Sequence, residues 1–264
     1  MVGTIVQRFG QNGNTLYRLL GLWGHPGTDV VYGWHTPVGS KYAGVVAKIY
    51  DNDKFVASDN YTMVSIIVDD GIECFEWQVG HLDVAAGIVA GRHVEKNEII
   101  GFEANHGPVY YNGIRITEAA REAGSQAAHH AHYQKRGLIP VTKTKPGKRY
   151  LDGQTSSPYF DGSCYYEYAE QNNGFAGCID PLKPVLNRSL TIGMSGYDVF
   201  VLQRILRKHG FLTAEPTGYF GALTLAALTA WQKANGLTPA PIFGPKSREL
   251  ALKETRPLPD LLEA

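Results

Sequence analysis

Ala127-Ala128-His129-His130-Ala131-His132-Tyr133 is the stretch from which the rest of the chain is interpreted. In an extended strand, side chains two residues apart point to the same face of the sheet. His130 and His132 would therefore project side by side, with Ala131 between them turned the other way. One imidazole can bind a metal ion while its neighbour transfers a proton, and this pair suits metal-assisted hydrolysis. Taken alone, the stretch could also be a run of surface histidines.

A second histidine motif lies far upstream, in His25-Pro26-Gly27-Thr28-Asp29. It places an imidazole and a carboxylate four residues apart. Pro26 and Gly27 cannot continue a helix, so the spacing predicts a turn whose ends converge. Eight of the nine histidines precede Tyr133, and only His209 follows it. Any histidine chemistry therefore belongs to the first half of the chain.

The composition excludes several classes of function. A chain of 264 residues with a hydrophobic fraction of 44% fits one or two globular domains. Lys and Arg together equal Asp and Glu, at 25 each, which leaves no basic footprint for nucleic acid. No apolar run reaches the ~20 residues of a membrane span. We expect a monomer that binds no nucleic acid and does not cross a membrane.

The N-terminus and the cysteines bear on where the protein acts. The stretch from Met1 to Gly10 lacks the basic start and long apolar core of a secretory signal, so the general export route is not expected if Met1 is the true start. The three cysteines form no Cys-x-x-Cys pair, which argues against a structural zinc knuckle. Cys164 and Cys178 could pair in an oxidising space or remain two thiols.

The first part of the chain has the pattern of an antiparallel β domain. Short β-branched runs, separated by Gly, Asn and Asp clusters, occur at residues 30–32, 44–50, 63–68 and 98–102. Residues 116–123 are helix-prone and form an insertion ahead of the histidine stretch. We therefore predict a β-rich domain over residues 1–140.

The rest of the chain changes character twice. Residues 141–187 are predicted to be a linker with an aromatic patch, which is either a packed hairpin or a sugar-stacking platform; the patch comprises Tyr159-Phe160 and Tyr165-Tyr166-Glu167-Tyr168. Residues 198–210 read as an amphipathic helix with Asp198 as its cap and Gly210 at its end. Further helices are predicted near 222–235 and after Pro245. The predicted fold class is α+β and multidomain: an antiparallel β-rich domain, then a small all-α three-helix domain over 188–264.

The histidine motifs resemble the lysostaphin-type zinc endopeptidases of bacterial cell walls. The resemblance covers roughly residues 8–140 and rests on several motifs in order. These are His25-x-x-x-Asp29, Thr36-Pro37-Val38-Gly39-Ser40, Ala43-Gly44-Val45-Val46, Gly80-His81-Leu82, Val94-Glu95-Lys96-Asn97-Glu98-Ile99-Ile100-Gly101 and His130-x-His132.

This resemblance implies a Zn2+ cofactor bound by His25, Asp29 and His132, with His130 and His81 as the catalytic histidines. Two imidazoles and one carboxylate are a usual catalytic zinc set that leaves the fourth position for water. The chain departs from the family at Ala131, where Leu is usual, and at Asn97, where Gly is usual. His129, next to the motif, could compete as a ligand.

The C-terminal part resembles the three-helix peptidoglycan-binding domain, over about residues 189–253. The matching segments are Gly196-Tyr197-Asp198-Val199 with Leu202-Gln203, Gly218-Tyr219-Phe220-Gly221 with Thr224, and Trp231-Gln232-Lys233-Ala234-Asn235-Gly236-Leu237. Together the two resemblances imply an endolysin-like peptidoglycan hydrolase that cleaves peptide bonds in the stem or cross-bridge. We expect it to be made in the host cytoplasm, from a phage or prophage, and to reach the wall through a membrane pore; a bacterial wall hydrolase is the second choice.

Three alternatives keep the motifs but change the function. The first is a catalytically degenerate wall-binding or activator protein. The second is a virion structural protein that carries a lytic domain. The third is a zinc carboxypeptidase that uses Glu103-Ala104-Asn105-His106 as a ligand segment, which would leave His130-x-His132 without a role.

Overall fold

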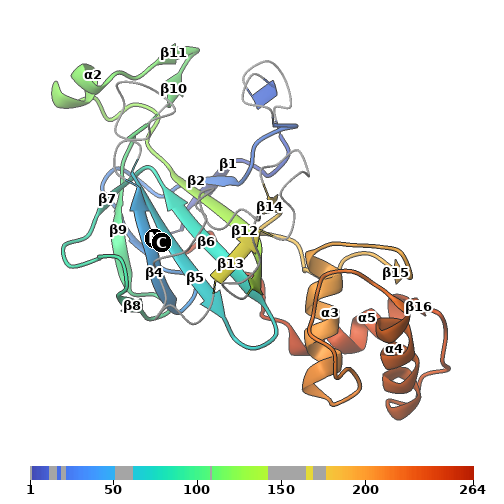
Figure 1. Cartoon of the computed structure of the whole chain (residues 1–264). Helices are drawn as coiled ribbons and strands as arrows, with labels where there is room; N and C mark the ends of the chain where they lie inside the picture. The colour runs from blue at the N-terminus through green and yellow to red at the C-terminus, as the bar shows by residue number, and fades with distance from the viewer. Residues whose placement is uncertain are drawn as a thin grey trace.

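The fold is seen in a computed structural model that describes residues 2–11, 17–18, 22–50, 62–107, 109–141, 165–168 and 177–264. Its main feature is a twisted antiparallel sheet with strand order β1-β2-β12-β6-β5-β4-β8 (Figure 1). The strands are β1 Thr4–Gln7, β2 Thr28–Val31, β12 Ala131–Val141, β6 Cys74–Gly80, β5 Met63–Asp69, β4 Gly44–Tyr50 and β8 His93–Val94. Two further strands, β13 Tyr165–Tyr168 and β14 Cys178–Ile179, also pair with β12.

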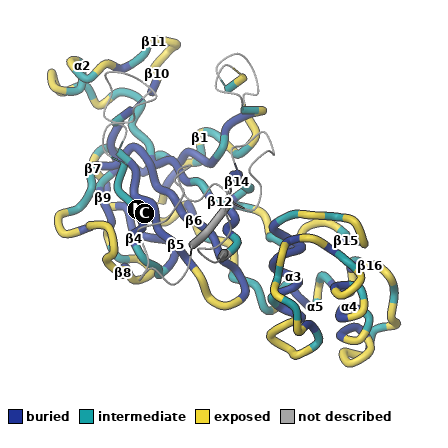
Figure 2. The backbone as a smooth tube through the Cα atoms, in the orientation of Figure 1, coloured by how far each residue is buried: buried dark blue, intermediate teal, exposed yellow. Residues whose placement is uncertain are grey.

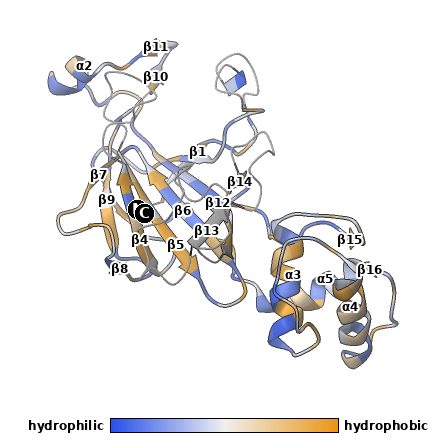
Figure 3. Cartoon of the chain, in the orientation of Figure 1, coloured by the Kyte–Doolittle hydropathy of each residue, from blue (hydrophilic) through white to orange (hydrophobic). Residues whose placement is uncertain are grey.

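A second, three-stranded sheet has the order β3-β9-β7, with β3 Pro37–Gly39, β9 Ile99–Glu103 and β7 Leu82–Val84. The central strands are buried along almost their whole length (Figure 2). Trp77, Phe75 and Tyr133 are the large aromatic side chains of this core. The apolar runs from which strands were predicted therefore form the buried strands of the sheet (Figure 3). The prediction of an antiparallel β-rich domain is confirmed.

The insertion before the histidine stretch projects beyond one end of the sheet as an arm, residues 109–123 (Figure 1). It consists of the hairpin β10 Tyr110–Tyr111 and β11 Ile114–Arg115, followed by helix α2 Glu118–Glu122. The helix begins where Thr117 accepts a hydrogen bond from the Ala120 N–H. The predicted helix is thus present in shorter form, and the hairpin before it was not predicted.

The C-terminal part contains the three predicted helices, α3 Tyr197–Lys208, α4 Ala222–Ala234 and α5 Pro245–Ala251. A small two-stranded sheet and a 3-10 helix accompany them: β15 Leu190–Thr191, β16 Ile242–Phe243 and η2 Leu252–Glu254. The predicted apolar face of α3 is buried, as Leu202 and Leu206 are fully enclosed. Asp198 is not the helix cap, because Gly196 holds that position. The Asp198 carboxylate instead pairs with Arg188, at 3.0 Å from Nη2.

The end of the chain returns to the β domain, and both chain ends lie against the sheet (Figure 1). Val2 and Glu263 form an antiparallel bridge. The Arg256 N–H donates to the buried Glu73 carboxylate at 3.0 Å. Parts of all three predicted segments, 1–140, 141–187 and 188–264, therefore meet on one sheet.

Other predictions lie partly outside the described residues. Tyr159, Phe160 and Cys164 fall there, so neither the aromatic patch as a whole nor the Cys164–Cys178 pair is tested. Across the described ranges, none of the helices has the length and apolar character needed to cross a membrane.

Candidate metal centre

Strand pairing brings the distant motifs together. On β12, His132 lies opposite Asp29 of β2 on one side and opposite Gly80 of β6 on the other. His81 follows Gly80 directly. Ala131 is fully buried on the other face of β12, so the alternation expected for a strand is present. The sheet thus gathers side chains that are about a hundred residues apart in sequence.

His25 is supplied by the turn that leads into β2. Its N–H donates to the Gln11 carbonyl, and its own carbonyl accepts from the Gly10 N–H, both at 2.9 Å. The turn lies directly on β12 at Gly27. A Cβ atom at this position would lie 2.3 Å from the Tyr133 carbonyl oxygen and 2.8 Å from His132 Nε2. Only glycine allows the turn to approach so closely, which explains the residue after Pro26.

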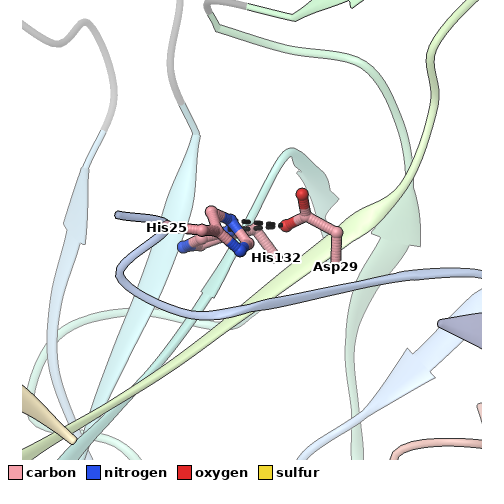
Figure 4. A group of neighbouring side chains, drawn as sticks. All are labelled: His25, Asp29 and His132. Carbon is pink, nitrogen blue, oxygen red and sulfur yellow. Dashed lines mark hydrogen bonds and ion pairs between the residues drawn. The ribbon is translucent and has the colours of Figure 1, made fainter. Parts of the chain in front are cut away.

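His25, Asp29 and His132 point toward one another (Figure 4). Asp29 Oδ1 lies 2.6 Å from His132 Nδ1 and 3.2 Å from His25 Nε2, and the two ring nitrogens are 3.0 Å apart. All three residues are buried. Burial alone would raise the pKa of Asp29, but the charges of His130 and His132 and hydrogen bonds from His132 and His25 hold that pKa well below its usual range.

This donor set fits a zinc ion. Tetrahedral zinc with bonds of ~2.0–2.1 Å to N and O places its ligand atoms about 3.3 Å apart. The separations of 3.2 and 3.0 Å are close to this value, and the separation of 2.6 Å between Asp29 and His132 is shorter. Two nitrogens and one oxygen are also the ligand types that zinc prefers. It is the one group of three such ligands found among the described residues.

His130 and His81 stand beside this triad, and a backbone carbonyl holds each ring. His130 Nδ1 lies 2.9 Å from the Ala128 oxygen, and His81 Nδ1 contacts the His106 oxygen. Because a carbonyl can only accept, both Nδ1 atoms carry the proton, and both Nε2 atoms are unprotonated in the neutral rings. The ring centroids of His81 and His130 are 4.4 Å apart, and His130 Nε2 is 3.7 Å from Asp29 Oδ1.

His81 is held in an unusual backbone conformation. Its φ of 61° is in the left-handed region, which is uncommon for a residue other than glycine. The His81 N–H donates to the Thr62 oxygen, and its carbonyl accepts from the Ala104 N–H, both at 2.9 Å. Burial, followed by the charges of His130 and His132, lowers the pKa of His81 well below its usual value. A neutral imidazole is therefore expected at neutral pH before metal binds.

All five residues singled out in the sequence thus lie in one site, whereas the competing candidates lie elsewhere. His129 contacts the buried Glu103 carboxylate, which also accepts from the Tyr32 N–H at 2.6 Å. His106 Nε2 lies 2.5 Å from Asp83. Glu103 and His106 therefore have separate partners and do not form the carboxypeptidase-type ligand pair. Asn105 and Arg121, which contact backbone carbonyls around this site, were not predicted. No pattern in the sequence marks such contacts.

Comparison with known proteins begins with the C-terminal part. Residues 195–246 match a family model described as a peptidoglycan binding domain. Residues 195–246 belong to that domain family. The SleB N-terminal domain is a similar solved structure, 36% identical to the part it covers; the match spans 26% of this chain and 96% of that chain, with a TM-score of 0.25. The peptidoglycan-binding domain therefore accounts for α3, α4 and the start of α5.

Two further solved structures are each similar to part of the chain. One is a mutant catalytic domain of the prophage-encoded M23 protein EnpA from Enterococcus faecalis, at 17% identity, covering 51% of this chain and 81% of that chain, with a TM-score of 0.33. The other is the catalytic domain of the antimicrobial peptidase lysostaphin from Staphylococcus simulans, at 20% identity, with 43% and 68% coverage and a TM-score of 0.31. No curated protein matches the chain. The family model is the one that the C-terminal sequence motifs resemble.

Proposed function

We propose that this protein is a zinc-dependent endopeptidase of peptidoglycan, held on the wall by its C-terminal domain. The proposal is carried by one observation: a buried His25–Asp29–His132 triad with the rings of two further histidines, His81 and His130, beside it. A metal-binding group without nearby acid-base residues would suit a structural role. Here the acid-base residues and the triad share one site, which suits hydrolysis.

His25, Asp29 and His132 would hold the zinc ion. When bound, zinc supplies a Lewis acid that polarises the scissile carbonyl and brings the pKa of a water toward neutrality. His130 Nε2 faces the triad and can take a proton from the attacking water as a general base. The bond from His130 Nδ1–H to the Ala128 carbonyl keeps this nitrogen unprotonated in the neutral ring.

His81 is suited to the second proton transfer. Its ring is close to that of His130, with the two centroids 4.4 Å apart. The proton that His130 takes from the water can pass to the leaving amine directly or by way of His81, whose ring, once protonated, can also donate a hydrogen bond to the oxyanion. Its buried environment favours return to the neutral ring, which readies the site for the next cycle.

The C-terminal domain indicates the class of substrate. Its family match is to peptidoglycan binding, and its helices contain no residue of the triad. Tethering a catalytic site near an insoluble polymer raises its local concentration, to the millimolar range for short flexible linkers. The peptide bonds of the wall are therefore the proposed substrate.

The test is digestion of purified peptidoglycan from several bacteria, with mass spectrometry of the released fragments. New amino termini should appear without new reducing sugar ends. Removal of zinc with a chelator should abolish release, and one equivalent of zinc should restore it. Reducing ends that rise with lysis would indicate a glycosidase and contradict the proposal. Zinc binding without any release would support the degenerate, wall-binding alternative.

A further inference from the structure

The segment 105–107 contacts His81 and also the residues that precede His130. The His106 carbonyl accepts the His81 Nδ1–H, while the His106 ring turns away to Asp83. His106 thus contributes its backbone oxygen to the site. The position of that oxygen decides which nitrogen of His81 carries the proton, so whatever fixes the segment also sets His81.

Asn105 connects this segment to the second histidine. Its side chain is 1% exposed, and its Nδ2 donates to the carbonyls of Ser125 at 3.0 Å and Ala127 at 2.9 Å. The next residue, Ala128, has a φ of 58°, and its oxygen accepts the His130 Nδ1–H. A left-handed alanine is strained and persists where its surroundings hold it. Asn105 supplies two of the hydrogen bonds that hold the backbone just before it.

Arg121 ties the same segment to the arm of residues 109–123. Its Nη1 donates to the Ile116 oxygen at 2.9 Å and makes longer contacts with the oxygens of Asn105 at 3.3 Å and Gly107 at 3.5 Å. These last two carbonyls flank His106 on both sides. Helix α2 has no fully buried residue, and its hydrophilic character is plain in Figure 3. The contacts of Arg121, rather than apolar packing of α2, join this helix to the catalytic region.

We propose that Asn105 and Arg121 are positioning residues for the two histidines. Arg121 acts on His81 through the His106 carbonyl, and Asn105 acts on His130 through Ala128. The insertion then helps to hold the backbone carbonyls that contact the two histidines. This inference rests on the proposed function for its kinetic consequences, but the tautomers of His81 and His130 can be observed without any activity.

The kinetic test compares Arg121→Ala and Asn105→Ala with Glu122→Ala, which changes the exposed neighbour of Arg121 on the same helix. Misplacement of a catalytic group by ~1 Å can cost about a hundred-fold in rate. We expect kcat on a soluble wall peptide to fall ten- to a hundred-fold in the first two variants, with KM and bound zinc unchanged, by the same principle. Glu122→Ala should match the wild type. Arg121→Lys, which can still reach one carbonyl, should recover part of the lost kcat.

The second readout is ring 15N NMR of the zinc-free protein. Wild type should show His81 and His130 with the proton on Nδ1. Arg121→Ala should add the Nε2–H form of His81, and Asn105→Ala that of His130. Unchanged tautomers in folded variants would overturn the inference, whatever happens to kcat. Tautomer shifts in a protein that never cleaves peptidoglycan would sustain the inference and refute the proposed function. If Arg121→Ala does not fold, Arg121→Lys and Asn105→Ala still decide the result.

Discussion

Gly27→Ala should weaken zinc binding while the protein still folds. The reason is that the turn that carries His25 and Asp29 contacts β12 at this residue. The added Cβ would lie 2.3 Å from the Tyr133 oxygen, whereas an ordinary contact begins at 3.4 Å. The Tyr133 carbonyl belongs to a central strand and cannot yield easily. The turn must therefore move away by about 1.1 Å, the difference between these two distances. Metal–ligand distances in zinc sites are expected within about 0.2 Å of their usual values, so a shift of this size is large for the ligands that the turn carries.

We expect the zinc affinity of Gly27→Ala to fall at least ten- to a hundred-fold, the range seen when the surroundings of metal ligands are disturbed. This corresponds to about 1.4–2.8 kcal/mol of binding free energy. The assay is competition for zinc with a chelator of known affinity, together with a thermal unfolding curve of the zinc-free protein. Gly244→Ala is the control, since its Cβ meets nothing within 4 Å. Wild-type zinc affinity in Gly27→Ala would refute the assignment of this turn to the metal centre.

Three further predictions address the ligands, the catalytic histidines and the end of the chain. His132→Ala should lose the single equivalent of zinc found by metal analysis, while His93→Ala, at an exposed histidine of β8, should retain it; full zinc in both would show that the ligand is wrong. His130→Ala should keep zinc and fold but lose ~10²–10⁴-fold in kcat, and turnover within a few-fold of wild type would remove its acid-base role. Deleting residues 255–264 should lower the midpoint of thermal unfolding by at least ~2–4 °C and slow hydrolysis of a soluble peptide. Leu258→Ala, at an exposed side chain of the same segment, should do neither; a deletion as stable and active as wild type would mean that the tail is dispensable.

The strands and the shared face of His130 and His132 were accessible from the sequence because their signals are local. β-branched runs between turn residues predicted β4, β5 and β9, and a two-residue spacing placed His130 and His132 on one face. That His25 and Asp29 join them was implied by the resemblance to the lysostaphin-type endopeptidases, not by a local signal. The Asp198 cap was predicted from a local signal too, but it was wrong because Arg188, ten residues upstream, engages the carboxylate.

The contacts that orient the rings of His81 and His130 could not be predicted from the sequence, for a physical reason. The acceptors of His81 and His130 are backbone carbonyls, which every residue possesses, so no residue type marks them. Asn105 and Arg121 contact carbonyls around the site that are 14 to 22 residues away in the chain. Their importance depends on the path of the backbone, which composition and periodicity do not specify.

Hydrogen bonds connect the end of the chain to the strand that carries His132. The Tyr32 hydroxyl donates to the Leu261 oxygen at 2.6 Å, so the Tyr133 hydroxyl, 2.8 Å away, must donate to Tyr32. Burial raises the pKa of Tyr133 well above its usual value, which keeps that proton in place. Tyr133 follows His132 on β12. Loss of the tail would leave the Tyr32 hydroxyl without this acceptor, at a cost of about 1–3 kcal/mol for a buried group. That cost would fall on the strand that carries His132, which links the C-terminal residues to the proposed metal site.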